Sequence, residues 1–384
     1  MSGDRISGII SVDDHLIEPP DLFEGRMPAH LVERAPKIVE FENGQQAWVY
    51  EDQLFANVGL NAVAGRPRDE WSMEPARFDE MRPGCFDIHE RIKDMDAGGI
   101  LASVCFPSLI AGFCGAVFSR SKDPELGLAC VRAWNDWHLD YWAGTYPGRM
   151  IPLQIPWLKD VEVAAEDVRR NAERGFQAVS FAELPAKLDL PSLHSHYWDP
   201  FLAACEETGT VLCLHTGSSG WAPIPSPDPP FELFPTLFPA SSLVAATDWL
   251  WSRVCLRYPG LRIAMSEGGI GWVAMLADRA DYVLDHSASG TESRSWRGDL
   301  KPSEVLARNF WFCTIDDPSS VDAVIDRMGP DHIMVESDYP HADSTWPNTA
   351  DTVEANFGHL PDDIVRKVTV ENAAALFGVE VPAL

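Results

Sequence analysis

Two polar residues stand directly after the first apolar run of the chain, Gly8–Val12. They are Asp13 and His15, and residues at positions i and i+2 of an extended strand point to the same side. A carboxylate and an imidazole placed in this way can face one metal ion. A single Asp-x-His pair also occurs by chance, usually as the capped end of a strand. The pair therefore indicates a metal site only together with further ligands.

Four more polar residues each end a later apolar run, and they are Glu183, His215, Glu267 and Asp338. Taken singly, a histidine in such a place is as often a satisfied core residue as a ligand. A carboxylate there is costly unless a partner or a cation compensates its charge. Together with Asp13 and His15, these residues make six candidate metal ligands at corresponding ends of predicted strands.

Eight short apolar runs alternate with helix-like segments, a pattern typical of βα units around a parallel sheet. The predicted strands are Gly8–Val12, Ser103–Pro107, Met150–Ile155, Ala178–Glu183, Val211–Thr216, Arg262–Glu267, Phe310–Ile315 and His332–Ser337. The predicted helices include Ile88–Ala97, Pro124–Gly144, Val161–Arg174, Trp198–Glu207, Ser241–Tyr258 and Ser319–Met328. This alternation favours a closed (β/α)8 TIM barrel over an open doubly wound sheet, with residues 1–384 as one domain. The carboxyl ends of the strands, where the candidates lie, form the functional face of such a barrel.

The interval 19–85, after the first predicted strand, is too long for a simple connection and predicts an insertion. Within it, Lys37–Glu42 and Gln45–Glu51 flank the turn dipeptide Asn43-Gly44, which favours a tight hairpin. We expect this hairpin-containing insertion to form a lid over the barrel mouth. A second irregular stretch, Gly217–Pro239, is rich in Pro and aromatic residues and predicts an ordered loop without a helix.

Four motifs in this order resemble the amidohydrolase superfamily: Val12–Leu22, Leu214–Ser218, Ser266–Trp272 and Ser337–His341. The resemblance is to its branch of metal-dependent hydrolases and decarboxylases related to aminocarboxymuconate-semialdehyde decarboxylase, and it spans nearly the whole chain. It implies metal ligands at Asp13, His15, His215 and Asp338. In that family the first motif is commonly His-x-His and the sixth strand ends in His. This chain has Asp13 and Glu267 at those two positions.

The candidate ligands are two imidazoles with three carboxylates, or four counting Glu183. Such an oxygen-rich set suits several divalent metals. The resemblance implies Zn first, with Fe or Mn next. Because carboxylates can bridge two ions, we expect one or two ions in the site.

Metal-assisted hydrolysis of an acyl-type bond (amide, ester, lactone or thioester) is the main prediction for the activity. A bound metal lowers the pKa of water from about 16 to near 7 and supplies hydroxide. Asp338 would orient that water and take its proton, and Glu267 would be a second-ion ligand or a general acid. His341 would carry protons or support Asp338.

Two other interpretations remain open. The first alternative is non-oxidative decarboxylation of an aromatic or unsaturated acid, in which a nearby acid protonates the carbon that loses carbon dioxide. The resemblance implies a sixth-strand His for that reaction, so Glu267 favours hydrolysis. The second alternative is a barrel that binds a small molecule without turnover, against which the full set of ligands argues.

Aromatic residues in the predicted lid and mouth segments suggest a bulky apolar or aromatic small-molecule substrate. They are Trp48, Trp71, Phe113, Trp221, Phe231, Phe234, Phe238, Trp272 and Trp346. Arg66, Arg68 and Arg82 are candidates for contact with an anionic group, with placement on the surface as the alternative.

The composition, with 46% hydrophobic and 23% charged residues, is that of a globular protein with a large core. A net charge of −28 would repel nucleic acids and anionic membranes, so we expect neither as a partner. The beginning of the chain lacks the apolar stretch of a signal peptide and no later run could cross a bilayer, which predicts a cytoplasmic protein. The 8 cysteines contain no CxxC pair and are expected to be reduced core residues. The resemblance also implies a homodimer.

Overall fold

The computed structural model describes residues 6, 8–71, 75–287, 296, 298–314 and 317–381. Its main sheet is parallel, with the spatial strand order β6-β5-β1-β12-β11-β10-β9-β8-β7. The strands are β1 (Ile9–His15), β5 (Ile100–Phe106), β6 (Met150–Ile151), β7 (Leu153–Gln154), β8 (Ala178–Phe181), β9 (Val211–His215), β10 (Ile263–Ser266), β11 (Phe310–Thr314) and β12 (Ile333–Val335). All eight predicted strands are present. Two parts of these predictions lie outside the described residues. They are Ile315, the last residue of one predicted strand, and Met1–Arg5, the start of the segment that was predicted not to be a signal peptide.

Strands β6 and β7 are two halves of one chain segment and lie at the two ends of the sheet order. Met150 of β6 pairs with Ser103 of β5, whereas Leu153 of β7 pairs with Ala178 of β8. Between them, the carbonyl oxygen of Pro152 accepts a hydrogen bond from the backbone N–H of Ala178 (3.2 Å). One segment therefore joins both ends of the sheet, and the strands form the predicted (β/α)8 barrel.

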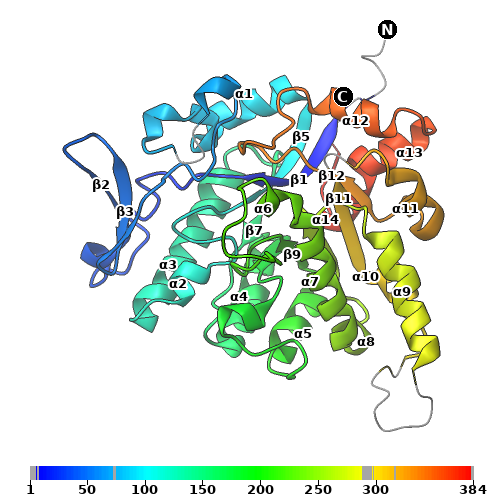
Figure 1. The fold of residues 1–384 in the computed structure, drawn as a ribbon. Coiled ribbons are helices and arrows are strands. Elements are labelled where there is room, and N and C mark those ends of the chain that lie inside the picture. Colours follow the sequence, from blue (N-terminus) through cyan, green and yellow to red (C-terminus); the bar gives the residue numbers. More distant parts are fainter. Residues whose placement is uncertain are drawn as a thin grey trace.

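The helices lie around the outside of the strands (Figure 1). They are α1 (Ile88–Gly98), α2 (Ala116–Ser119), α3 (Pro124–Trp137), α4 (Val161–Arg174), α5 (Asp199–Thr208), α6 (Leu233–Thr236), α7 (Phe238–Ser252), α8 (Val254–Arg257), α9 (Val273–His286), α10 (Pro302–Asn309), α11 (Val321–Met328), α12 (Thr349–Phe357), α13 (Asp362–Arg366) and α14 (Asn372–Phe377). A π-helical segment, η5 (His138–Ala143), extends α3, and a second one, η7 (Lys367–Glu371), joins α13 to α14. Short 3-10 helices are η1 (Val32–Arg34), η2 (Arg68–Glu70), η3 (Phe78–Glu80), η4 (Pro83–Cys85) and η6 (Pro185–Leu188).

Local sequence explains where several of these helices begin and end. Asp160 caps α4 by accepting hydrogen bonds from the N–H groups of Glu162 and Val163. The same helix ends at Gly175, whose φ of 109° is unfavourable for any residue with a side chain. One prediction was wrong in part: Leu233–Thr236, inside the stretch predicted as a loop, forms the short helix α6. The N–H of Thr236 closes that turn on the carbonyl of Glu232.

The amino-terminal end of the barrel is filled by apolar side chains. Val12, Cys213 and Met334 point into this interior cluster, and Leu376 and Phe377 of α14 pack against it. This end is closed, so a ligand must enter at the carboxyl ends of the strands, as expected for this fold. Among the described residues, no helix is long and apolar enough to span a membrane.

The insertion after β1 contains a three-stranded antiparallel sheet of β2 (Lys37–Glu40), β3 (Gln46–Tyr50) and β4 (Gln53–Phe55). The predicted hairpin is therefore present as β2 and β3, with a further strand after it. Figure 1 shows this sheet projecting beyond the barrel on one side. Trp48 of β3 is buried and packs edge-on against Phe23, so it belongs to the core instead of the barrel mouth.

Candidate metal centre

Asp13, His15, His215 and Asp338 meet at the carboxyl ends of β1, β9 and β12. The Nε2 atoms of His15 and His215 lie 3.0 Å apart, and each lies 3.6 Å from Oδ1 of Asp13. Oδ1 of Asp338 lies 3.5 Å from Nε2 of His15. Two ligand atoms about 2.1 Å from one ion are about 3.0–3.4 Å apart at right or tetrahedral angles. Asp13, His15 and His215 are therefore close enough to bind one ion together, and Asp338 adjoins them through His15.

An irregularity in β1 places Asp13 and His15 on the inner face of the barrel. Strand alternation from the inward-facing Ile10 and Val12 alone would turn Asp14 inward and its two neighbours outward. The pairing of β1 with β5 shifts between Ser11 and Asp14, which reverses the alternation. Asp13 and His15 consequently face the barrel axis.

The carboxylate of Asp14 instead lies outside the metal centre and connects three strands through hydrogen bonds. It accepts hydrogen bonds from the hydroxyls of Ser11 (3.0 Å), Ser337 (2.5 Å) and Ser103, and from the backbone N–H of Tyr339 (3.1 Å). These partners come from β1, β5 and the segment after β12. Asp14 therefore holds the backbone that carries Asp13 and Asp338.

The imidazole of His215 is oriented for metal binding by its own backbone. Its Nδ1 lies 2.6 Å from the carbonyl oxygen of Thr216, which can only accept a hydrogen bond. The proton therefore sits on Nδ1, and Nε2 presents a lone pair to the cluster. Burial lowers the pKa of His215 to about 3, and it also lowers the pKa of His15. Both imidazoles are thus neutral, the form that binds metal.

The two aspartates of the cluster lack compensating partners. Both carboxylate oxygens of Asp13 and of Asp338 are buried, and none accepts a hydrogen bond from the described residues. Burial, and then the surrounding carboxylates, raises the pKa of both side chains. Such groups are costly in a protein interior without a cation. The residues present therefore fit a divalent metal ion.

Glu267 and His341 lie beside this cluster, on the side of the barrel mouth. Oε2 of Glu267 lies 3.5 Å from Nε2 of His215. Nδ1 of His341 lies 3.0 Å from Oδ1 of Asp338, and its ring packs against the ring of His15 with centroids 4.0 Å apart. Both Glu267 and Asp338 have left-handed backbone, with φ of 58° and 52°. Strain of this kind is commonly found at functional sites.

Two functional candidates escaped the sequence analysis. Asp343 forms a second group of close ligands with Glu267, Asp338 and His341, and its only signal was its place in the same loop as His341. Glu336 lies deeper, and its Oε2 accepts hydrogen bonds from the N–H of Glu267 (3.1 Å) and from the thiol of Cys313. Burial raises its pKa to about 7. Its signal was its position two residues before Asp338, just after the predicted apolar run.

Glu183 belongs to none of the groups of close ligands found among the described residues. Its Oε1 accepts hydrogen bonds from the N–H of Gly217 (2.9 Å) and the hydroxyl of Ser219 (3.0 Å). Its own N–H donates to the hydroxyl of Ser218 (3.0 Å). These contacts hold the loop after β9, and the predicted role of Glu183 as a ligand stays a prediction.

A pocket of about 650 Å³ leads from the barrel mouth to the cluster and contains Glu267, His341 and Asp343 in its wall. Five of the nine aromatic residues predicted to contact substrate line it, and they are Trp71, Phe113, Phe231, Phe234 and Phe238. The other four were misplaced by the prediction, because Trp48 and Trp272 are buried in the core, Trp346 packs on Tyr339, and Trp221 lines a different groove. Arg66, Arg68 and Arg82 are not among the residues that line the pocket.

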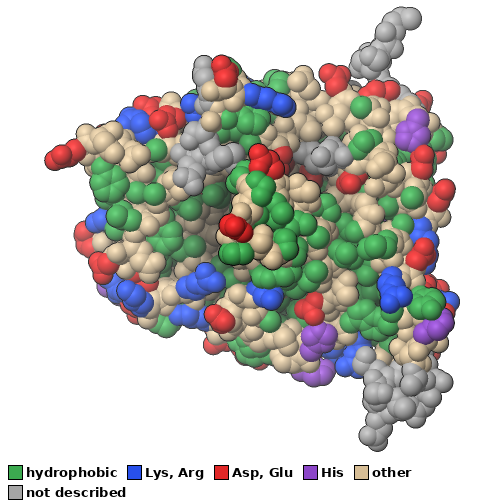
Figure 2. Space-filling model, viewed as in Figure 1, with side chains coloured by type: hydrophobic (Ala, Val, Ile, Leu, Met, Phe, Trp, Pro, Cys, Tyr) green, Lys and Arg blue, Asp and Glu red, His purple; other side chains and the backbone are tan. Residues whose placement is uncertain are grey.

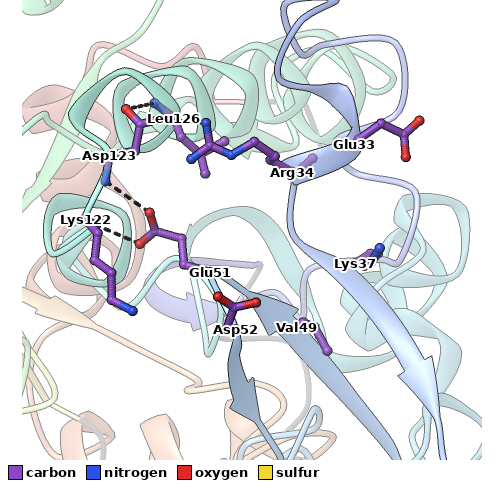
Figure 3. Close-up of a pocket in the computed structure, with 10 residues that line it drawn as sticks. Glu33, Arg34, Lys37, Val49, Glu51, Asp52, Lys122, Asp123 and Leu126 are labelled. Atoms are coloured by element: carbon purple, nitrogen blue, oxygen red, sulfur yellow. Dashed lines mark hydrogen bonds and ion pairs between the residues drawn. The ribbon is translucent and has the colours of Figure 1, made fainter.

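Two other hollows carry no group of candidate ligands. One, of about 450 Å³, lies at the base of the hairpin, where the carboxylate of Glu51 accepts hydrogen bonds from the N–H groups of Lys122 and Asp123 and anchors the hairpin to the barrel (Figure 3). The other is an apolar groove of about 790 Å³ between α7 and α9, with Val244 and Met275 in its wall. On the face shown in Figure 2, hydrophobic side chains gather in this area. The pocket at the barrel mouth is thus the candidate functional site.

A family model described as amidohydrolase matches residues 27–379, which is most of the chain. The matched part includes β9, β10 and β12 with their polar ends, whereas Asp13 and His15 precede it.

Solved structures of similar fold include an amidohydrolase from Mycobacterium avium subsp. paratuberculosis K-10, which is 22% identical with a TM-score of 0.76 and covers 97% of this chain and 100% of its own. A 5-carboxyvanillate decarboxylase from Sphingomonas paucimobilis is 19% identical with a TM-score of 0.65, and the coverage is 97% and 100%. A dihydroxybenzoic acid decarboxylase from Polaromonas sp. JS666, with bound manganese and the inhibitor 2-nitroresorcinol, is 17% identical with a TM-score of 0.66, and the coverage is 97% of each chain. At these identities the likeness shows the shared fold.

Proposed function

The chain belongs to the amidohydrolase family, and from this premise we propose that it is a metal-dependent, non-oxidative decarboxylase of an aromatic acid. This was the alternative in the sequence analysis, where hydrolysis was the main prediction. The observation that carries the proposal is the aromatic-walled pocket, whose wall contains the carboxyl group of Glu267 and the ring of His341, next to the candidate metal ligands His215 and Asp338. The similar structures named as decarboxylases of aromatic acids support the same choice.

Asp13, His15 and His215 would hold the ion, because their ligand atoms converge, and Asp338, beside His15, would complete the set. When bound, a divalent ion would supply positive charge that binds the substrate's carboxylate and neighbouring oxygen atoms. The manganese bound in the similar dihydroxybenzoic acid decarboxylase structure favours Mn²⁺, and the mixed nitrogen and oxygen ligands suit Mn²⁺ as well as Zn²⁺. The prediction of Zn first stays a prediction.

The chain's own residues would divide the remaining work between them. The apolar wall would hold the aromatic ring and exclude water from it. As the bond between the ring and the carboxyl group breaks, its electron pair stays on the ring carbon, carbon dioxide leaves, and Glu267 donates a proton to that carbon. The side chain of Glu267 is 13% exposed, so it can take a proton back from solvent.

Hydrolysis of an acyl-type bond is the second candidate, and a specific observation favours it. Glu267, Asp338, His341 and Asp343 form a group that could hold a second ion and that shares Asp338 with the first group. Paired ions are common in enzymes that activate water.

The third interpretation, binding without turnover, would show no product from either class of substrate. The predicted homodimer also stays a prediction, which light scattering of the purified protein can check.

The test uses the manganese-loaded and zinc-loaded protein with 2,6-dihydroxybenzoate in bicarbonate-free buffer. We expect carbon dioxide and the matching phenol in equal amounts, with one deuterium on the ring when the solvent is D₂O. Glu267→Gln should lose at least about 100-fold in turnover at unchanged metal content. Metal loss in that variant, together with cleavage of phenyl esters or anilides and no carbon dioxide, would favour hydrolysis instead.

A further inference from the structure

A loop of the insertion, residues 57–71, forms the pocket wall together with the residues of the metal centre, and we call it the cap loop. Asn57, Leu60, Asn61 and Trp71 of this loop line the same pocket as Glu267. The β2–β3 hairpin contributes no residue to this wall among those that line the pocket. The cap loop, and not the hairpin, is therefore the part of the insertion that a substrate would meet.

The cap loop has an unusual backbone at the positions that line the pocket. Asn57, Leu60 and Asn61 have φ of 64°, 31° and 65°, in the left-handed region that a leucine rarely adopts. Hydrogen bonds within the loop hold this shape, from the N–H of Leu60 to the carbonyl of Asn57 (2.9 Å) and from Ala62 to Gly59 (2.8 Å). Strain that is held in this way is typical of ligand-binding segments.

The cap loop is also fixed relative to the metal centre. The N–H groups of Val63 and Ala64 both donate to the carbonyl oxygen of Pro340, each at 3.0 Å. Pro340 lies between Asp338 and His341 in the same loop. The distance between the cap loop and the cluster is therefore set by backbone contacts instead of by mobile side chains. A substrate can contact the cluster at one end and the cap loop at the other at the same time.

The pocket offers neutral polar groups and carboxylates but no side chain that carries a fixed positive charge. Its charged lining residues are Glu267 and Asp343, and neither lysine nor arginine is among the described residues that line it. Asn57 and Asn61 are amides, and Oδ1 of Asn61 is enclosed without a hydrogen-bond partner among the described residues. An enclosed amide oxygen without a partner is costly, and a hydroxyl or N–H of a ligand would satisfy it.

We propose that the cap loop selects the part of the substrate remote from the metal, and that Asn57 and Asn61 favour a neutral hydrogen-bonding substituent over a second carboxylate. The substrate is then an aromatic acid with one carboxylate at the metal and a hydroxyl or amine elsewhere on the ring. A second carboxylate would lie in a pocket whose described lining holds Asp343 and the carboxyl group of Glu267 but no lysine or arginine to balance it. This inference rests on the proposed function only for the aromatic acid as ligand class.

The test measures binding to the manganese-loaded protein by calorimetry, so it does not need turnover. The probes are 2-hydroxybenzoates with hydrogen, hydroxyl or carboxylate at position 4 or position 5. In at least one of the two series we expect the hydroxyl compound to bind at least about ten-fold more tightly than the carboxylate compound, and more tightly than the unsubstituted one. Equal affinity within both series, preference for the carboxylate, or no binding of any probe overturns the proposal.

Variants locate the effect on the cap loop. Asn61→Gly removes the amide and keeps a residue that accepts φ of 65°, so it should bring the hydroxyl preference down to about two-fold or less. Asn61→Asp keeps the shape, adds a carboxylate and should weaken every probe. Asp52→Gly, at φ of 64° in the turn between β3 and β4, is the matched control and should bind all probes like the parent protein. Asn57→Gly is the second variant should Asn61→Gly fail to fold, and an unchanged preference in both overturns the proposal.

The binding test and the turnover test can fail independently of each other. Selective binding of the hydroxyl probe without carbon dioxide release contradicts the proposed decarboxylation and leaves the role of the cap loop standing. Carbon dioxide release from every probe, at equal rate and with equal affinity, supports the proposed decarboxylation and contradicts the proposed role of the cap loop.

Discussion

The Nε2 atoms of His15 and His215 lie 3.0 Å apart, although 200 residues separate them in the chain. Nδ1 of His215 faces the carbonyl of Thr216, so its Nε2 directs a lone pair toward the other ring. Oδ1 of Asp13 lies 3.6 Å from both nitrogen atoms. Two imidazoles and a carboxylate that converge in this way, inside the protein, form a site for a cation.

Asp13→Asn should separate metal binding from folding. In the metal-free protein the carboxylate of Asp13 is buried without a hydrogen-bond partner among the described residues and lies among other carboxylates, so loss of its charge should raise the free energy of unfolding by about 1–3 kcal/mol. The same substitution should weaken Mn²⁺ binding by at least about 100-fold, because a ligand loses its charge. Urea unfolding of metal-free protein and metal titration measure the two effects. Lower stability together with unchanged affinity would contradict the assignment of Asp13 as a ligand.

Asp14→Asn, one residue away, should behave in the opposite way. Asp14 accepts hydrogen bonds from three serine hydroxyls and the N–H of Tyr339, and an amide cannot accept all of them. We expect a loss of about 1–3 kcal/mol of stability in the metal-free protein. Folded Asp14→Asn protein should keep the metal content of the parent protein, as elemental analysis would show. A loss of metal without a loss of stability would mean that Asp14, not Asp13, faces the ion.

The number of ions can be read from Asp343→Asn. Asp343 belongs only to the second ligand group, so the variant should leave the first ion in place. If the parent protein binds two ions per chain, the variant should bind one. If the parent binds one, the ratio should not change. Manganese-to-chain ratios by elemental analysis, with electron paramagnetic resonance to detect coupled ions, decide between the two. Complete loss of metal in Asp343→Asn would contradict the division into two groups.

Glu336 is expected to act as a positioning residue for Glu267. A neutral amide in Glu336→Gln can still accept the hydrogen bond from the N–H of Glu267, so turnover should fall by less than about three-fold. Glu336→Ala removes the acceptor and should lower kcat by about 10–100-fold with little change in KM. Cys313→Ser serves as the matched control for the thiol contact. If Glu336→Gln lost the metal, Glu336 would be a ligand instead.

His138 should make the protein sensitive to acid. It is fully buried against Trp134, burial lowers its pKa from 6.5 to about 3, and neither ring nitrogen has a hydrogen-bond partner among the described residues. Between pH 6.5 and 3 the unfolded chain binds a proton at this residue that the folded protein does not, so stability falls as the pH falls. From pH 7 to pH 5 the loss from this one residue is about 2 kcal/mol.

His138→Phe keeps an aromatic ring at that position and removes the titration, so it should lose about 2 kcal/mol less than the parent between pH 7 and pH 5. Urea unfolding at the two pH values measures the difference. His286→Phe is the matched control, because His286 also stacks on an aromatic ring but is exposed. An unchanged pH dependence in His138→Phe would show that the ring is hydrated in solution.

Local sequence predicted the barrel well, because each strand and helix is encoded by its own residues. Apolar runs form all eight strands. Asp160 and Gly175 stand at the two ends of α4, and Asn43-Gly44 forms the turn of the hairpin. The same locality placed Asp13, His15, His215, Glu267 and Asp338 at strand ends, which meet at one end of any parallel barrel.

The tertiary structure decided which of these residues face the ion and what surrounds them. The shifted pairing of β1 with β5 turned Asp13 inward and Asp14 outward, and alternation within β1 alone would have given the opposite. Glu183 accepts a hydrogen bond from the loop after β9, while Glu336 and Asp343 lie beside the candidate ligands. The cap loop, instead of the hairpin, came to line the pocket. Each of these outcomes depends on contacts between residues far apart in the chain, and such contacts leave no periodic pattern in the sequence.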